Sequence, residues 1–239
     1  MGAGPGDPGL ITVRGMDLIR QADVIVFDAL ANPKLLDAAP LGCELIDAGK
    51  RAKEHKLTQE QTNALLAERA LAGLRVVRLK GGDPYVFGRG GEEAIYLHER
   101  GVPVEVVPGI TAAIAGPAYA GIPITHRNVA TTCTFVTGHE SPEKDKTQVD
   151  YQSLAGLIQR GGTVCFYMGM GRLPMIADQL IGFGCTTDTP AAVVQWGTLP
   201  QQRSLRSTLS NVADAVQTRK LSSPAIIVVG DVAALDDDA

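Results

Sequence analysis

The sequence is poor in cysteine and in aromatic residues. Its 239 residues include 4 cysteines, 1 tryptophan, 5 tyrosines and 5 phenylalanines. The cysteines are widely separated without a Cys-x-x-Cys spacing, and the 4 histidines show no metal-ligand spacing. The sequence therefore predicts neither a disulfide scaffold nor a metal site. We expect reduced thiols, which are typical of a cytoplasmic protein.

The sequence also lacks long apolar runs and a strong charge of one sign. No stretch of about eighteen consecutive apolar residues occurs, and the first residues are rich in glycine and proline. Neither a membrane span nor a secretory signal is predicted. A net charge of −4, from 22 Lys and Arg against 26 Asp and Glu, argues against general nucleic-acid binding. An anionic substrate would need a local basic patch.

The first half of the chain alternates strand and helix signals, which predicts a parallel α/β sheet. Thr58 and Gln61 form a capping-box pattern that places the start of one helix. We expect helices over 58–72 and 91–100, and strands over 23–27, 44–47, 75–79 and 104–107.

The pattern changes from Thr131 onward, where strand-like runs are mixed with few helical segments. This predicts a second α/β domain with a mixed sheet. We expect an N-terminal domain over 1–110 and a C-terminal domain over 111–239, with the active site in the cleft between them. The expected elements are strands over 132–137, 163–167, 191–195, 204–208 and 225–229, and helices near 112–119, 173–181 and 211–216.

The most informative segment is the glycine-rich run from Lys80 to Glu93, which directly follows a strand-like stretch. Its sequence is Lys-Gly-Gly-Asp-Pro-Tyr-Val-Phe-Gly-Arg-Gly-Gly-Glu-Glu. Glycine allows the main chain to approach a ligand closely and tolerates positive φ. A surface turn is the simpler interpretation, but the length and repetition of the run favour the floor of a small-molecule site.

A second glycine-rich segment, from Gly2 to Gly9, suggests a dinucleotide-binding loop. The pattern does not fit, because Asp7 stands where that fingerprint needs glycine. Pro5 and Pro8 also remove N–H groups that a pyrophosphate would use. Nicotinamide binding, and with it a dehydrogenase, is therefore an unfavoured alternative.

Several motifs together resemble those of the tetrapyrrole methylase family, and the resemblance runs from end to end. Within that family, the run from Lys80 to Glu93 and the Thr-His-Arg segment resemble the branch that acts on uroporphyrinogen III. The motifs that carry the resemblance lie at 2–10, 27–30, 49–51, 80–93, 107–112, 121–127, 167–169 and 223–225.

The resemblance implies a cytoplasmic homodimer that methylates uroporphyrinogen III at carbons 2 and 7 to give precorrin-2. The implied methyl donor is S-adenosyl-L-methionine, held between the two domains, and no metal is implied. The product would enter siroheme, cobalamin or haem d1 biosynthesis. Two alternatives remain open: methylation of a later precorrin, and a non-catalytic protein that binds a tetrapyrrole or the donor.

The resemblance also implies a donor site drawn from several loops. Asp83 would face the ribose hydroxyls or the amino group, while Val86 and Met168 would offer apolar walls. The full set carried over by motif is Pro5, Gly81, Gly82, Asp83, Val86, Thr111, Ala112, Met168 and Gly197.

The implied substrate carries eight carboxylates, so cationic side chains are expected around it. We expect this role for Arg51, His126 and Arg127, with Arg89. Family resemblance makes Asp28 the candidate proton acceptor and Lys50 the candidate donor. Two alternatives stay open: Asp28 could cap a helix, and Arg89 with Glu92 could act on the proton.

One departure from the family pattern concerns the start of the chain. Family members carry an apolar strand and a valine before Gly-Ala-Gly-Pro-Gly, where this sequence has Met1. Our hypothesis is that a GUG valine codon was taken as the start, so that the natural chain begins upstream. Without that strand, the first sheet would lack a central parallel strand.

Overall fold

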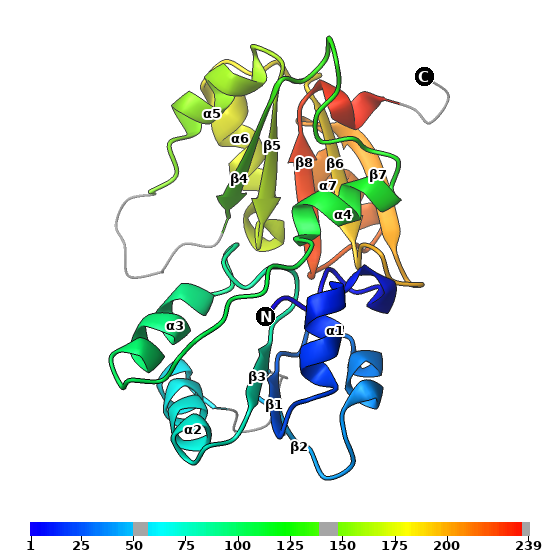
Figure 1. Ribbon diagram of the computed structural model, residues 1–239. Helices are drawn as coiled ribbons and strands as arrows, with labels where there is room; N and C mark the ends of the chain where they lie inside the picture. Colours follow the sequence, from blue (N-terminus) through cyan, green and yellow to red (C-terminus); the bar gives the residue numbers. More distant parts are fainter. Residues whose placement is uncertain (50–56, 139–147, 236–239) are drawn as a thin grey trace. The chain divides into compact units, whose positions relative to one another are not determined.

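The computed structural model describes residues 1–49, 57–138 and 148–235 (Figure 1). The chain divides into two compact units, Met1–Ala112 and Ala113–Ala239. Two predicted site residues, Lys50 and Arg51, lie outside the described residues.

The first unit contains a three-stranded sheet of order β2-β1-β3, and both pairings are parallel. The strands are β1 (Val24–Phe27), β2 (Glu44–Asp47) and β3 (Val76–Leu79). Phe27 pairs with Asp47 on one side and with Leu79 on the other, so all three strands end at one edge. The predicted parallel sheet is confirmed, and its carboxyl edge carries the glycine-rich run.

The first residues of the chain run beside the end of β3. Lys80 N donates to Met1 O at 3.0 Å, and Ala3 N donates to Lys80 O at 2.7 Å. On the other side, Gly2 N donates to Val107 O at 2.9 Å. The strand predicted over 104–107 is wrong, because this segment forms no regular ladder and its valines 104 and 106 are exposed. The hypothesis of an upstream start stays a prediction.

Helices cover both faces of this sheet (Figure 1). On one face, Ile25, Val77 and Leu79 pack with residues of α1 (Val13–Ile19) and of the 3₁₀ helix η2 (Pro33–Ala38). On the other face, Val24 and Val26 pack with α2 (Gln59–Leu71) and α3 (Gly90–His98). The capping box at Thr58 and Gln61 is confirmed, with both reciprocal hydrogen bonds formed. The sequence did not predict α1, or the short η1 (Pro8–Leu10) before it.

The second unit contains a five-stranded mixed sheet, as predicted, of order β4-β5-β8-β6-β7. Its one parallel pairing joins β4 and β5, and the other pairings are antiparallel. The strands are β4 (Thr132–Thr137), β5 (Gly162–Tyr167), β6 (Pro190–Gln195), β7 (Arg203–Thr208) and β8 (Ala225–Val229).

Three helices bury an apolar core against one face of the second sheet, in which Phe166, Ile176 and Ile227 are fully buried. They are α5 (Tyr151–Ile158), α6 (Leu173–Gly182) and α7 (Val212–Thr218); α5 was not predicted. The helix α4 (Ala112–Tyr119) covers the other face, where Gly116 faces the Val194 side chain. Two short 3₁₀ helices complete the unit, η3 (Met170–Arg172) and η4 (Asp231–Ala234).

Candidate active site

Three glycines bring main chain together at the carboxyl edge of the first sheet. A Cβ atom on Gly2 would lie 2.5 Å from the Cα of Gly109 and 2.6 Å from the carbonyl oxygen of Gly82. Gly82 has a φ of 67°, exchanges two hydrogen bonds with Gly4, and faces Thr111. Side chains at Gly2 and Gly109 would separate these segments, whereas at Gly82 it is the left-handed backbone that favours glycine. The glycines therefore have a packing role in addition to the predicted ligand role.

Asp83 ties two of these segments together. Its Oδ1 accepts from Tyr85 N at 2.8 Å, and its Oδ2 accepts from Gly109 N at 3.0 Å. The carboxylate therefore holds the turn after β3 against the loop that carries Thr111. Carboxylate oxygens can accept more than one bond, so this does not prevent the predicted contact with a donor.

The predicted donor residues of the first unit gather at this edge. Pro5 directly follows Gly4, which pairs with Gly82. Thr111 and Ala112 lie next to Gly82, within 4 Å of the position of an added Cβ atom. Val86 closes the turn by donating its N–H to Asp83 O at 3.4 Å. The structure thus brings together residues separated by more than a hundred positions.

Arg89 and Glu92 form an exposed ion pair at the start of α3. Arg89 is in the left-handed region at φ 59°, and its guanidinium donates to both oxygens of Glu92 at 3.0 and 2.6 Å. The hydrogen bond from Arg89 lowers the pKa of Glu92 below its usual range. A carboxylate held in its ionised form in this way is a weaker proton acceptor.

Asp28 follows β1, and cations surround it. Its Oδ1 accepts from Arg78 Nη2 at 2.5 Å, and its Oδ2 lies 3.7 Å from Lys80 Nζ. The alternative role as a helix cap is wrong, because Asn32 is the residue that caps η2. The structure therefore places Asp28 next to two cations, and its role in proton transfer stays a prediction.

Two predicted residues of the second unit lie at one edge of its sheet. Met168 directly follows β5, and the Trp196–Gly197 turn directly follows β6. Because β8 lies between β5 and β6 and is antiparallel to both, β5 and β6 end at the same edge of the sheet. The Met168 side chain is 52% exposed on a left-handed backbone of φ 54°. An exposed thioether side chain held there can form an apolar wall for a ligand.

Gly197 has a clear packing role. A Cβ atom on it would lie 2.7 Å from the Cα of Gly116 in α4. Its neighbours Trp196 and Thr198 are left-handed, at φ 50° and 70°. Strained backbone often marks functional turns, and no sequence pattern indicates such strain at these positions.

His126 and Arg127 lie at the opposite edge of the second sheet. Their exposed turn is closed by two hydrogen bonds between His126 and Ala130, just before β4 begins. Val129 in the same turn lies beside Gly161, at the amino end of β5. A six-residue strand spans about 20 Å, so the structure does not bring these residues together with Met168.

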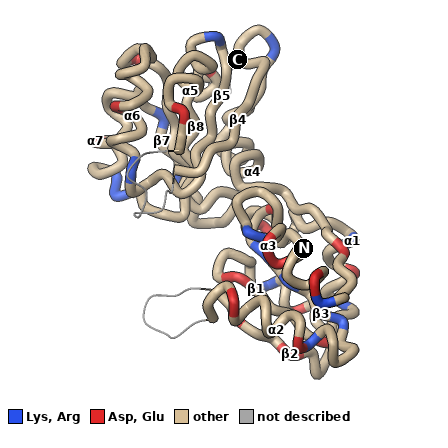
Figure 2. Tube along the Cα trace, turned by 90° about the vertical axis from the view of Figure 1, so that its left-hand side faces the viewer, with Lys and Arg blue, Asp and Glu red and all other residues tan. Residues whose placement is uncertain are grey.

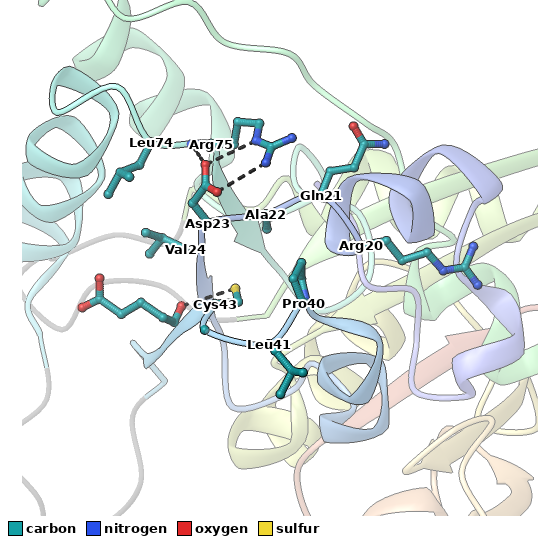
Figure 3. Close-up of a pocket in the computed structure, with 12 residues that line it drawn as sticks. Arg20, Gln21, Ala22, Asp23, Val24, Pro40, Leu41, Cys43, Leu74 and Arg75 are labelled. Carbon is teal, nitrogen blue, oxygen red and sulfur yellow. Dashed lines mark hydrogen bonds and ion pairs between the residues drawn. The ribbon is translucent and has the colours of Figure 1, made fainter.

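One cavity, of about 500 Å³, lies at the amino edge of the first sheet (Figure 3). Its walls include the ion pair of Asp23 and Arg75, with Arg20 and Cys43. None of the predicted site residues that the structure describes lines it. Ligands of open parallel sheets bind beyond the carboxyl ends of the strands, so we place the candidate site at the opposite edge.

Within residues 1–49, 57–138 and 148–235, no group of three or more His, Cys, Asp or Glu is arranged to hold a metal ion. In the same part of the chain, no helix is long and apolar enough to span a membrane. All four cysteines are in the described residues, and none forms a disulfide.

Comparison with known proteins assigns the family. The model of the family described as Tetrapyrrole (Corrin/Porphyrin) Methylases matches residues 1–213. The chain therefore belongs to the tetrapyrrole methylases, as its motifs predicted.

Two curated relatives and one solved structure are particularly similar. A uroporphyrinogen-III C-methyltransferase of Bacillus subtilis is 50% identical over 97% of this chain, but the match spans only 47% of that relative. A Methanosarcina barkeri protein, named an S-adenosyl-L-methionine-dependent uroporphyrinogen III methyltransferase, is 49% identical over 99% of this chain and 92% of its own length. The Thermus thermophilus uroporphyrin-III C-methyl transferase complexed with S-adenyl homocysteine superposes with a TM-score of 0.81, at 35% identity over 98% of this chain and 97% of that one.

Three charged residues near Asp28 were missed by the sequence analysis. Arg78, Lys80 and Glu93 surround it on the face covered by α2 and α3. A signal was present, because Arg78 and Lys80 are two positions apart and so lie on one face of a strand. Glu93 could not have been placed there without knowing how α3 packs.

Proposed function

We propose that this chain transfers methyl groups from S-adenosyl-L-methionine to carbons 2 and 7 of uroporphyrinogen III, giving precorrin-2. The observation that carries the proposal is the Methanosarcina relative, which matches at 49% identity over nearly its whole length. The glycine-rich carboxyl edge of the first sheet supports it independently, because it offers main chain to a small molecule.

The residues present fit the donor. Gly81 offers its main chain beside Gly82, whose own main-chain groups pair with Gly4. Thr111 and Asp83 offer polar groups, and Met168 offers an apolar surface. When bound, S-adenosyl-L-methionine supplies an electrophilic methyl group on a sulfonium centre. The task of these residues is to hold the donor in line with a pyrrole carbon, and such alignment can supply about 7–11 kcal/mol of the barrier.

Cationic side chains would hold the carboxylates of the macrocycle. We propose Arg89 for this role in the first unit, because its guanidinium is exposed at the end of the glycine-rich run. Breaking its pair with Glu92 costs little, since exposed ion pairs contribute under about 1 kcal/mol. Arg51, His126 and Arg127 stay candidates from the family resemblance.

Each methylation removes a proton from the macrocycle, and we propose Asp28 as its acceptor. Asp28 is held by Arg78 but keeps 28% of its side chain exposed, so a substrate proton can reach it. The alternative, Glu92, is bound through both oxygens to Arg89, and it is the family resemblance that favours Asp28 over it. Lys50 stays the candidate proton donor.

The proposal includes a homodimer located in the cytoplasm. Four cysteines without a disulfide agree with a reducing compartment. Size-exclusion chromatography with light scattering would measure the mass in solution and would contradict the dimer if a monomer were found.

The test is an anaerobic incubation of the purified chain with uroporphyrinogen III and methyl-labelled donor, followed by mass analysis. We expect a product that carries two added methyl groups. Donor binding without transfer would favour a non-catalytic protein, and transfer only to a later precorrin would favour another member of the family. Retention of NAD in place of the donor would favour a dehydrogenase.

A further inference from the structure

Four charged side chains form one network on the α2 and α3 face of the first sheet, and we call it the charge network: Asp28, Arg78, Lys80 and Glu93. Figure 2 shows cationic and anionic segments next to each other around β3 and α3. The two cations bind both carboxylates, so the four formal charges sum to zero.

The strand register places the network. Val26 pairs with Arg78, and Asp28 N donates to Leu79 O at 3.1 Å, so the parallel pairing continues one step beyond the end of β1. Side chains two positions apart lie on one face of a strand. Arg78 and Lys80 therefore point to the same face, on which Val24 and Val26 also lie.

Glu93 is the buried anchor of this network. A single oxygen, Oε1, accepts from Arg78 Nε at 3.1 Å, from Lys80 Nζ at 3.0 Å and from Gln59 Nε2 at 3.1 Å. Glu93 and Lys80 are each only 4% exposed. Burial raises the pKa of Glu93, but the charges of Arg78 and Lys80 and the hydrogen bonds from Gln59 and Lys80 outweigh it and lower that pKa. Glu93 is thus a nearly buried carboxylate whose ionised form is stabilised by the two cations.

Asp28 is the exposed member of the same network. Both carboxylates share both cations, so any change at one alters the charge that the other experiences. Glu93 keeps Arg78 and Lys80 partly neutralised. Without Glu93, Arg78 and Lys80 would lose their buried partner, and nothing else in the network would hold them in the positions from which they bind Asp28.

We propose that Glu93 is a positioning residue, which acts through Arg78 and Lys80 to orient the Asp28 carboxylate. This inference rests on the proposed function, in which Asp28 receives the proton released by methylation. Glu93 itself does not reach the substrate, because it is buried. Other charged groups that act on the network are the Met1 amino group, Arg89 and Glu92.

The first test compares kinetics of wild type, Glu93→Gln, Asp28→Asn and the double variant. Glu93→Gln should lower kcat about tenfold or more, because a carboxylate held away from its working position transfers a proton less efficiently. Its KM and its affinity for S-adenosylhomocysteine should stay within about twofold, because a buried Glu93 contacts neither ligand.

The double variant separates positioning from general damage. If Glu93 acts through Asp28, the double variant should be no slower than Asp28→Asn alone. Multiplying effects would overturn the inference, as would a wild-type kcat in a folded Glu93→Gln protein. Glu93→Asp keeps the charge and should recover part of the lost kcat. Asp23→Asn, which removes an ion pair at the amino edge, should leave kcat unchanged.

A second measurement needs no catalysis, so it distinguishes failure of this inference from failure of the proposed function. Urea unfolding of the same four proteins gives their unfolding constants. Removing both carboxylates leaves two adjacent cations. The unfolding constant of the double variant should therefore increase about fivefold more than the product of the fold-increases in the two single variants. Independent effects within twofold would overturn the shared network even if wild type were inactive. An inactive wild type with strong coupling would contradict only the proposed function.

Discussion

A Cβ atom on Gly109 would lie 2.3 Å from the carbonyl oxygen of Gly82, a separation that packed atoms do not adopt. These residues belong to two loops that Asp83 joins through its bond to Gly109 N. The loop of residues 81–83, which we propose to contact the donor, therefore depends on a close main-chain contact with the loop of Gly109. This contact has consequences for stability and for binding.

We expect Gly109→Ala to destabilise the protein by about 1–3 kcal/mol, because the added methyl group forces the two loops apart. Affinity for S-adenosylhomocysteine should fall at the same time. Urea unfolding and calorimetric titration measure the two effects. Gly91→Ala in α3 is a matched control, since its Cβ meets no atom within 4 Å; wild-type stability in Gly109→Ala would contradict the packing role.

Met168 and Arg127 should differ in their effect on donor binding. Met168→Ala removes half-exposed apolar surface at the carboxyl edge of β5 and should weaken S-adenosylhomocysteine binding about tenfold. Arg127→Ala lies at the opposite edge of the same sheet and should leave that affinity within about twofold. Equal losses in calorimetric titration would contradict this placement of the donor.

The two candidate proton acceptors give separable outcomes. Asp28→Asn should lower kcat about 100-fold, the scale of a lost general base. Glu92→Gln should lower it less than tenfold, because the pKa of Glu92 is already lowered by its hydrogen bond from Arg89. Steady-state kinetics at saturating donor distinguish the two residues. A larger loss of kcat in Glu92→Gln than in Asp28→Asn would indicate that the pair of Arg89 and Glu92 accepts the proton.

Acid should destabilise the fold partly through Glu93. Its pKa is lower in the folded chain than the ordinary value of 4.5, so the unfolded state binds a proton first as the pH falls. This contribution to stability is fully present above about pH 4.5 and is lost as the pH decreases through the lower folded pKa. Urea unfolding from pH 7 to pH 3 should show a smaller acid-induced loss in Glu93→Gln than in wild type; identical slopes would argue against a buried, ionised Glu93.

Elements with a strong local signal were predictable from the sequence. The helix after Thr58 has a capping box, and the strands β1 and β3 are short, mostly apolar runs. The prediction of a strand over 104–107 was wrong. Alternating valines indicate only that a segment could pack in a sheet, and residues 104–107 do not pair with a neighbouring strand in a regular ladder.

The missed helices are short and lack strong periodicity. α1 spans seven residues and contains Gly15, and its cap is Thr12 without an acidic partner three residues on. α5 begins at Asp150, whose carboxylate accepts from Ser153 N, but it follows a polar stretch that obscured its start. Tertiary packing stabilises such helices more than their own propensity does.

The site was partly predictable for a similar reason. Motifs placed Gly82, Asp83 and Thr111 in the donor site, and the structure brings these three together. Glu93 gave no signal, because its role depends on α3 packing its first turn against β3. Long-range charge contacts of this kind arise from the fold and not from local sequence.

The most direct measurement of the central claim is a crystal structure of the chain with S-adenosylhomocysteine. The account predicts the ligand at the carboxyl edge of the first sheet, in contact with the main chain of residues 81–83 and with Thr111. Density for the ligand in the cavity beside Asp23 and Arg75, at the amino edge, would contradict it.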